Sequence, residues 1–392
     1  VGSALARMLL VLCVLPAAVV APTKLVVLQH GLYGAAVNMA VLQQELERLG
    51  GTEVAASCHQ PPPQVLVHSA SSNQGRTRDG VAAGGRRLAA EVERLVADVA
   101  HRGGSLRSIS LVGNSLGGLY ARHAAAELWD ARSGRIAGLE PDAFVTVGCP
   151  HLGVRRFTYL PLPPPLQGLG PLVAGRTADD LLLRDHLSRD ELMRGRGRPL
   201  LVELALEGGR GLASLRAFRR RRLYANLKGD FMVPFGTAAI EVEGWGAGLG
   251  DARRMDAFAE GCRRAGGYVD QAVMAGRASG LGAIRYDAPP LVEGSPPRDD
   301  DALRWEEAED ALRWEEAMCS GLDACGWSKV GCAWRSAGTA SPLAHNKLIA
   351  LRRPEGWTRA FGAIEATSEG RSVMAHAAAY LLYTSSVPSS VV

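Results

Sequence analysis

Ser115 lies at the centre of Gly113-Asn114-Ser115-Leu116-Gly117, which is a G-x-S-x-G pattern. In a nucleophile elbow this pattern places a serine on a tight strand-to-helix turn, where glycines two residues away avoid a steric clash. A serine hydroxyl held there can attack a carbonyl carbon once a general base removes its proton. The helix that follows would direct the backbone N–H of Leu116 toward a developing oxyanion. The alternative is a plain glycine-rich turn, and the flanking strand and helix favour the catalytic interpretation.

A second turn of this kind lies about eighty residues earlier in the chain. Residues 24–29 predict a buried strand, and His30-Gly31-Leu32-Tyr33-Gly34 follow it directly. A His-Gly-x-x-Gly turn is typical of the loop that supplies a second oxyanion donor, here the N–H of Leu32. Alone this motif also fits a simple turn before a helix. Together with the elbow around Ser115, it favours an oxyanion loop. We expect the substrate pocket to be bordered by His30, Gly31, Tyr33, Asn114 and His151.

A general base and an acid that orients it are the next requirement. Asp230 follows the predicted strand 221–227, although Gly229-Asp230 also fits an ordinary turn. Among nine histidines, His345 lies between the last predicted strand and the closing helix, in the region from which a base must reach the serine. His376 is the alternative, but it falls inside the closing helix. Serine, acid and histidine then follow the chain order of hydrolases with this elbow.

The elements that must position these residues alternate between strand and helix. Strands are predicted at 24–29, 64–69, 107–112, 143–147, 221–227 and 326–335, and helices at 37–49, 81–99, 116–129 and 370–382. This alternation predicts an α/β fold with a mostly parallel, doubly wound sheet. Function in such sheets is found at the carboxyl ends of the strands, where Leu32 and Ser115 are expected.

Two stretches interrupt this pattern within a predicted hydrolase domain at 23–383. Residues 157–216 open with four prolines and continue with helical segments near 178–192 and 199–206, which predicts a helical cap over the active site. A structural excursion over the sheet edge is the alternative. Residues 244–318 predict an irregular insertion, because they are rich in Gly, Arg and Pro and end in a duplication with a period of nine residues. We expect the duplication, Asp301–Ala308 and Asp310–Ala317, to form an exposed acidic helix.

The bulk composition argues against some classes of function. A net charge of +4 over 392 residues is too weak to indicate a nucleic-acid partner. The one basic run, Arg219 to Arg222, is expected to be a solvated flank of a strand. Seven scattered cysteines lack the paired spacing of zinc sites, so we expect no metal and mostly reduced thiols.

The two ends of the chain are assigned separately from the domain. Residues 1–22 contain an apolar run, Met8 to Ala21, that fits either a signal-peptide core or a remnant of upstream sequence. The compartment, secreted or endomembrane against cytoplasmic, therefore stays open. Residues 384–392 are polar and are expected to be a disordered tail.

Together these segments resemble the lipase-like serine esterase family of the α/β-hydrolase superfamily. The matching pieces are residues 26–34, Thr77-Arg78-Asp79-Gly80, residues 111–118, Cys149-Pro150-His151-Leu152-Gly153, Leu223-Tyr224-Ala225-Asn226 with Asp230 and Val233-Pro234, and Ala344-His345-Asn346. Gln29 and Asn114 depart from the residues that are commoner in that family. The resemblance implies a Ser115–Asp230–His345 triad that cleaves lipid or other carboxylic esters through an acyl-enzyme.

No cofactor is needed for this chemistry, and the expected partners are a lipid or ester substrate and a membrane surface. Two other functions stay open on the sequence. One is an acyltransferase that uses the same serine but passes the acyl group to an alcohol or thiol. The other is a catalytically silent protein of the same fold that binds a lipid or a partner.

Overall fold

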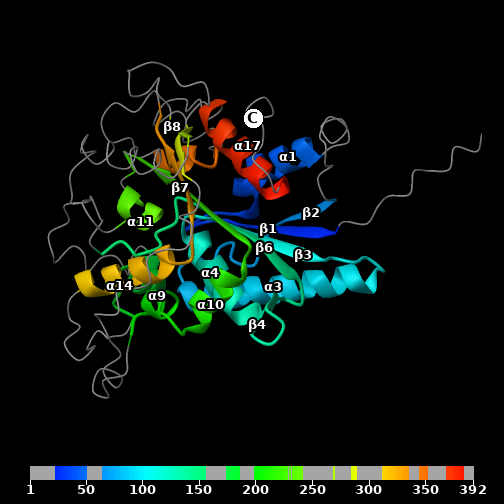
Figure 1. Ribbon diagram of the computed structural model, residues 1–392, viewed down its shortest axis with the longest axis horizontal. Helices are drawn as coiled ribbons and strands as arrows, with labels where there is room; N and C mark the ends of the chain where they lie inside the picture. The colour runs from blue at the N-terminus through cyan, green and yellow to red at the C-terminus, as the bar shows by residue number, and fades with distance from the viewer. Residues whose placement is uncertain are drawn as a thin grey trace, which may run out of the picture.

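The computed structural model describes residues 23–50, 64–155, 174–185, 198–227, 229–230, 232–241, 268–269, 284–288, 311–334, 344–351 and 368–383. Its centre is an eight-stranded sheet in the order β2-β1-β3-β6-β7-β10-β9-β8 (Figure 1). The strands in that order are Val65–Ser69, Lys24–Gln29, Ser108–Asn114, Glu140–Val147, Arg220–Asn226, Ser328–Cys332, Ile284–Ala288 and Tyr268–Val269. The first six are parallel, and β9 and β8 add antiparallel pairs at one edge. The predicted mostly parallel, doubly wound α/β sheet is confirmed.

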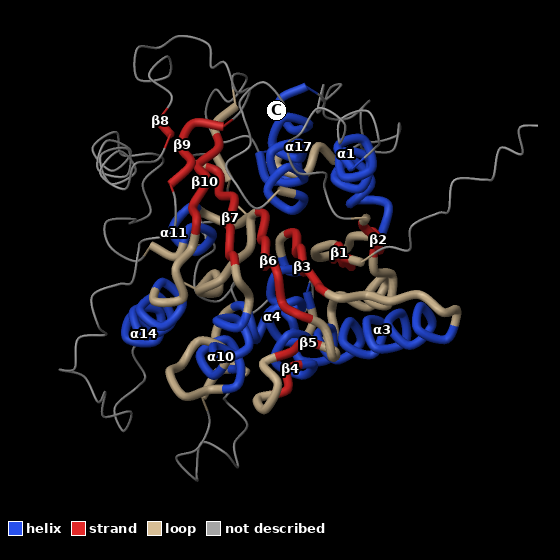
Figure 2. The backbone as a smooth tube through the Cα atoms, turned by 45° about the vertical axis from the view of Figure 1, so that its right-hand side comes forward, coloured by secondary structure: helices blue, strands red, loops and turns tan. Residues whose placement is uncertain are grey.

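Helices cover both faces of the sheet, so its central strands are apolar on both sides. The helices α3 (Val81–His101), α4 (Leu116–Leu128) and α10 (Arg210–Ala217) lie on one face. The helices α1 (Ala40–Gly50) and α17 (Ser368–Leu382) pack together on the other (Figures 1 and 2). Side chains alternate across a strand, so β1 contributes to the core on both faces. Leu25 and Val27 pack on the face covered by α3, α4 and α10, and Val26 and Leu28 pack on the face covered by α1 and α17.

The predicted cap region is described only in part. Its helices are α7 (Arg176–Leu181), α9 (Leu200–Glu203) and α10, and α10 packs against α4 as part of the layer that covers the sheet. In contrast, α7 lies at the start of α3, where the N–H of Val81 donates to the carboxylate of Asp180. Residues 156–173 and 186–197 lie outside the described residues, so a cap over the whole insertion stays a prediction.

The stretch expected to be irregular contributes to the sheet. Strands β8 and β9, which lie within 244–318, extend the sheet beyond β10. They have two and five residues, too few to produce a periodic pattern in the sequence.

The second copy of the duplication lies in α14 (Ala311–Asp323). This copy is helical as expected, but its expected exposure is wrong, because Trp314 and Glu315 are buried. Trp314 shares its buried face with Met318 and Leu322, which follow at intervals of four residues. The first copy lies outside the described residues, as do residues 1–22 and 384–392.

The basic run at the start of β7 also differs from expectation. Arg220 donates to the carbonyl oxygens of Tyr380 (2.6 Å) and Tyr383 (2.7 Å) and to Oδ2 of Asp142 (2.9 Å). Arg222 donates to Oγ of Ser328 at 3.0 Å. A solvated flank is therefore wrong for these two side chains: Arg220 ties the sheet to α17 and the residue that follows it, and Arg222 joins β7 to β10.

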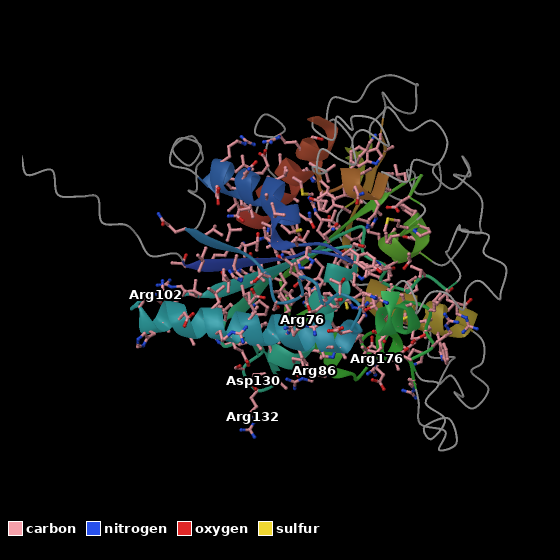
Figure 3. The ribbon with its side chains drawn as sticks, turned by 180° about the vertical axis from the view of Figure 1, so that it is seen from behind. Arg76, Arg86, Arg102, Asp130, Arg132 and Arg176 are labelled. Atoms are coloured by element: carbon pink, nitrogen blue, oxygen red, sulfur yellow. The ribbon has the colours of Figure 1, made fainter. Side chains whose placement is uncertain are left out.

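A two-stranded hairpin, β4 (Trp129–Asp130) and β5 (Arg135–Ile136), follows α4, and Asp130 and Arg132 project from its turn in Figure 3. None of the helices among the described residues combines the length and apolar character that a membrane crossing requires.

Candidate active site

Ser115 connects the end of β3 to the first residue of α4. Its φ of 54° and ψ of −129° are strained for a residue with a side chain. The flanking glycines permit this turn: a methyl group on Gly113 would lie 2.3 Å from Cα of Gly118, and one on Gly117 would lie 2.4 Å from the carbonyl oxygen of Gln29. The N–H of Ser115 donates to the carbonyl of Val147 at 2.8 Å. The predicted elbow residues thus form a tight strand–turn–helix. At positions 113 and 117 only glycine fits, because any Cβ atom would collide with backbone.

The loop after β1 lies directly against this serine. A methyl group on Gly31 would lie 2.8 Å from Cβ of Ser115 and 3.3 Å from its Oγ. The turn is closed by the N–H of Gly34, which donates to the carbonyl of Gly31 at 3.0 Å. The structure therefore brings the predicted oxyanion loop and the predicted nucleophile together.

His30 helps to set the direction of the Leu32 N–H. Its Nδ1 lies 3.0 Å from the carbonyl oxygen of Gly31, and since a carbonyl only accepts, Nδ1 is the donor. The N–H of Leu32 belongs to the same peptide plane as that carbonyl and points the opposite way. Burial lowers the pKa of His30, so the ring is neutral at physiological pH. Its Nε2 has no hydrogen-bond partner among the described residues.

Asp230 and His345 form a buried pair although 115 residues separate them. Nδ1 of His345 donates to Oδ2 of Asp230 at 2.9 Å. The other carboxylate oxygen of Asp230 accepts the N–H groups of Met232 (3.1 Å) and Val233 (2.9 Å). His345 lies in the short helix α15 (Ala344–Lys347) rather than in a loop. The carboxylate fixes the imidazole in the tautomer whose Nε2 carries a lone pair.

Two further residues support this carboxylate. Nδ2 of Asn226, the last residue of β7, donates to Oδ2 of Asp230 at 2.8 Å, and Nε1 of Trp334 donates to Oδ1 of Asn226 at 2.8 Å. Sequence reasoning assigned no role to either residue. Their positions in the sequence could have indicated this role, because Asn226 ends β7 and Trp334 follows β10. These strands are parallel neighbours, so their carboxyl ends lie side by side.

The pKa of His345 reflects two opposing effects. Burial lowers it, but the charge of Asp230 and the hydrogen bond to that carboxylate outweigh burial and raise it above the ordinary value. Its Nε2 is buried and has no partner among the described residues. A raised pKa and a free nitrogen are properties of a general base that works near neutral pH.

The end of β6 (Glu140–Val147) lies between the serine and the histidine. Val147 accepts the N–H of Ser115, and a methyl group on the next residue, Gly148, would lie 3.1 Å from Cε1 of His345. Ser115 and His345 therefore flank the same peptide at the carboxyl edge of the sheet.

The remaining predicted pocket neighbours lie at different depths. Tyr33 is 62% exposed, whereas Asn114, at the end of β3, is buried beside Gly31. His151 is fully buried: its Nε2 lies 2.9 Å from Oγ1 of Thr146, and its ring packs edge-on against Trp327. Burial also places the pKa of His151 well below its ordinary value. Within the described ranges, no three His, Cys, Asp or Glu side chains are grouped as metal ligands.

Comparisons with known proteins identify relatives of this chain. Residues 20–240 match the protein family described as "Putative serine esterase (DUF676)". The chain is 31% identical over 232 residues to "Putative lipase ROG1" of Saccharomyces cerevisiae, covering 58% of this chain and 30% of that protein. It is 29% identical over 230 residues to "Putative lipase C4A8.10" of Schizosaccharomyces pombe, covering 57% and 26%. These matches span less than a third of each relative's length.

Among solved structures, phospholipase PlaB from Legionella pneumophila aligns with 16% sequence identity and a TM-score of 0.35. The alignment covers 53% of this chain and 39% of that one.

Proposed function

The chain belongs to the DUF676 family of serine esterases, and from that premise we propose that it hydrolyses lipid or other carboxylic esters through an acyl-enzyme on Ser115. The observation that carries the proposal is the buried Asp230–His345 pair beside a strained elbow serine. A plain glycine-rich turn would give no reason for an oriented, charge-stabilised imidazole at the same sheet edge.

In the first half-reaction His345 is the general base. Its Nε2 takes the hydroxyl proton of Ser115 while Oγ bonds to the ester carbonyl carbon. Asp230 holds the ring and stabilises the imidazolium that forms. The imidazolium then returns the proton to the leaving alcohol as the carbon–oxygen bond breaks, which leaves the acyl group on Ser115.

The negative charge of each tetrahedral intermediate is stabilised by two backbone donors. These are the N–H groups of Leu116, at the start of α4, and of Leu32, whose peptide plane is held by His30 and Gly34. Loss of one such donor typically lowers the rate about 10²–10³-fold. Water activated by His345 attacks the acyl carbon in the second half-reaction and releases the acid.

The substrate is proposed to reach this site from a lipid surface. The large hydrophobic side chains exposed in the described part are Tyr33 (62%), Val37 (73%) and Met232 (41%). Tyr33 and Val37 follow β1 and Met232 follows β7, so these side chains border the same edge of the sheet as Ser115. An exposed apolar rim around a site favours contact with lipid.

A fluorophosphonate probe tests the proposed nucleophile. We expect the purified protein to be labelled at Ser115, as located by peptide mass, and labelling to fall sharply in His345→Ala. An unlabelled Ser115, beside a control hydrolase that reacts, would contradict the proposal and favour a catalytically silent binding protein.

A product assay then separates hydrolase from acyltransferase. With a p-nitrophenyl ester in water, we expect free acid to accumulate at the rate of nitrophenol release. If free acid stays low and an added alcohol or thiol acceptor raises turnover and receives the acyl group, the chain is an acyltransferase.

A further inference from the structure

Thr77 is a buried residue of the loop between β2 and α3 that the reaction scheme leaves without a role. Its Oγ1 accepts the backbone N–H of Tyr33 at 3.0 Å. Tyr33 directly follows Leu32, the proposed oxyanion donor. The hydroxyl of Thr77 therefore holds the peptide on one side of that donor, while His30 and Gly34 hold the peptide on the other.

The conformation of Tyr33 explains why this bond matters. Its φ of 55° lies in the left-handed region, which is unfavourable for a residue with a side chain. Such a conformation persists only where the surroundings hold it. The bond from the Tyr33 N–H to Thr77 acts directly on this backbone and is one of the contacts that hold it.

The backbone carbonyl of Thr77 joins the same loop to two helices. It accepts Oη of Tyr120 at 3.1 Å and Oγ1 of Thr177 at 2.8 Å. Tyr120 lies in α4, the helix that begins directly after Ser115, and Thr177 lies in α7. Through one residue the oxyanion loop is therefore tied to the helix that carries the other proposed oxyanion donor, Leu116.

We propose that Thr77 is a positioning residue of the oxyanion hole, which keeps the Leu32 N–H directed at the developing oxyanion. The assignment rests on the proposed hydrolase function. Because the oxyanion forms only after attack on the carbonyl, a misplaced donor weakens transition-state binding more than substrate binding. The loss should therefore appear in kcat and leave KM nearly unchanged.

Thr77→Val removes the hydroxyl acceptor at nearly constant volume, and Thr77→Ser retains it. The matched control is Thr177→Val, which makes the same chemical change in the same network but leaves the Thr77–Tyr33 bond in place. Each variant is titrated with the fluorophosphonate, so that kcat is expressed per reactive serine. Binding of an alkyl trifluoromethyl ketone, whose serine adduct places an anionic oxygen in the oxyanion hole, is measured in parallel.

We expect Thr77→Val to lose about tenfold in kcat and a similar factor in ketone affinity, with KM changed less than twofold. Thr77→Ser should recover most of this loss, and Thr177→Val should lose less than threefold. If Thr77→Val yields no folded protein, Thr77→Cys, whose thiol is a weak acceptor, replaces it.

Wild-type kcat and ketone affinity in the variant that removes the hydroxyl would overturn the assignment, even if its Tm falls. An equal loss in Thr177→Val would overturn it too, because that change leaves the Tyr33 contact intact. A wild-type protein that neither reacts with the probe nor turns over esters would instead overturn the proposed function, and the role of Thr77 with it.

Discussion

At the level of single side chains, the protonation state of His345 sets the pH range of the proposed reaction. The Asp230 charge holds the pKa of His345 above its ordinary value despite burial. A protonated ring cannot accept the Ser115 proton, so activity is lost as the pH falls through this raised pKa. We expect kcat/KM to rise with pH along a limb centred above about 6.5, measured with a soluble ester.

Replacement of the charge partner provides the control. Asp230→Asn keeps the shape of the side chain but removes the charge and the preference for the correct tautomer. We expect kcat to fall about 10⁴-fold, as for an equivalent change in serine proteases. A flat profile between pH 5 and 8 in the wild type, or near-normal kcat in Asp230→Asn, would contradict the role of this pair.

Asn226 is the second residue whose effect should be measured alone. Its Nδ2 donates to Asp230 and its Oδ1 accepts from Trp334, so Asn226→Ala removes one of the donors that hold the carboxylate. We expect about a tenfold loss of kcat per titrated serine. Trp334→Phe removes the indole N–H and part of the ring but leaves the Asn226–Asp230 bond in place, so it should cost less than threefold. Unchanged kcat in Asn226→Ala would make Asn226 a purely structural residue.

At the level of elements, the active-site edge depends on how closely β1 approaches the start of α4. A methyl group on Gly117 would lie 2.4 Å from the carbonyl oxygen of Gln29 and 2.5 Å from that of His30. Backbone atoms cannot move aside as a flexible side chain can. The contact therefore joins the loop after β1 to the start of α4, and it requires glycine at position 117.

Gly117→Ala should consequently destabilise the fold by about 1–3 kcal/mol in urea denaturation, and kcat should fall with it. Gly50→Ala is the matched control, since a methyl group on this last residue of α1 meets no atom of the described residues within 4 Å. We expect that control to lie within about 1 kcal/mol of the wild type. Equal stabilities of the two variants would mean that α4 and β1 can separate.

At the level of the whole molecule, the buried ion pairs around Asp142 lie at the end of the sheet opposite to the proposed active site. Lys24 and Arg220, the first residues of β1 and β7, both donate to Asp142 near the start of β6. Lys24 also donates to the carbonyl of Leu381 in α17. The amino end of the sheet is thereby tied to the closing helix, far from the carboxyl ends that hold the site.

Asp142→Asn should therefore lower stability without altering kcat per titrated serine. Loss of one partner of a buried ion pair costs about 3–5 kcal/mol, whereas Glu47→Gln on the exposed face of α1 should cost under about 0.5 kcal/mol. Burial raises the pKa of Asp142, but the charges of Lys24 and Arg220 outweigh this and lower it. The contribution of ionised Asp142 to stability is therefore fully present above the ordinary pKa of aspartate, and it is lost as the pH falls through the lowered pKa of Asp142. The difference between wild type and variant should shrink below about pH 4 in denaturation measured across pH.

The exposed apolar side chains of Tyr33, Val37 and Met232 lead to a prediction about binding to lipid surfaces. Val37→Ser combined with Met232→Ser removes two exposed apolar side chains that have no role in the proposed chemistry. We expect sedimentation with phosphatidylcholine vesicles containing phosphatidylglycerol to fall several-fold, while hydrolysis of soluble p-nitrophenyl acetate stays the same. Unchanged sedimentation would mean that lipid contact, if it occurs, uses another face.

The sequence by itself determined the local elements and the chemistry they carry. Periodic apolar residues and glycine turns depend on neighbours a few positions away, so the six parallel strands, the main helices and the elbow around Ser115 were predictable. The same holds for naming Asp230 and His345 as candidates, because both stand next to predicted elements. Their catalytic roles remain predictions.

Only the tertiary structure decided which distant groups meet. The Asp230–His345 pair joins residues 115 positions apart, and the Trp334–Asn226 and Lys24–Asp142 contacts span 108 and 118. Such contacts arise from strand order, which no local pattern encodes. The same reason explains the missed edge strands β8 and β9, the buried face of α14, and the inward hydrogen bonds of Arg220. Each depends on a partner surface that exists only once the sheet has assembled.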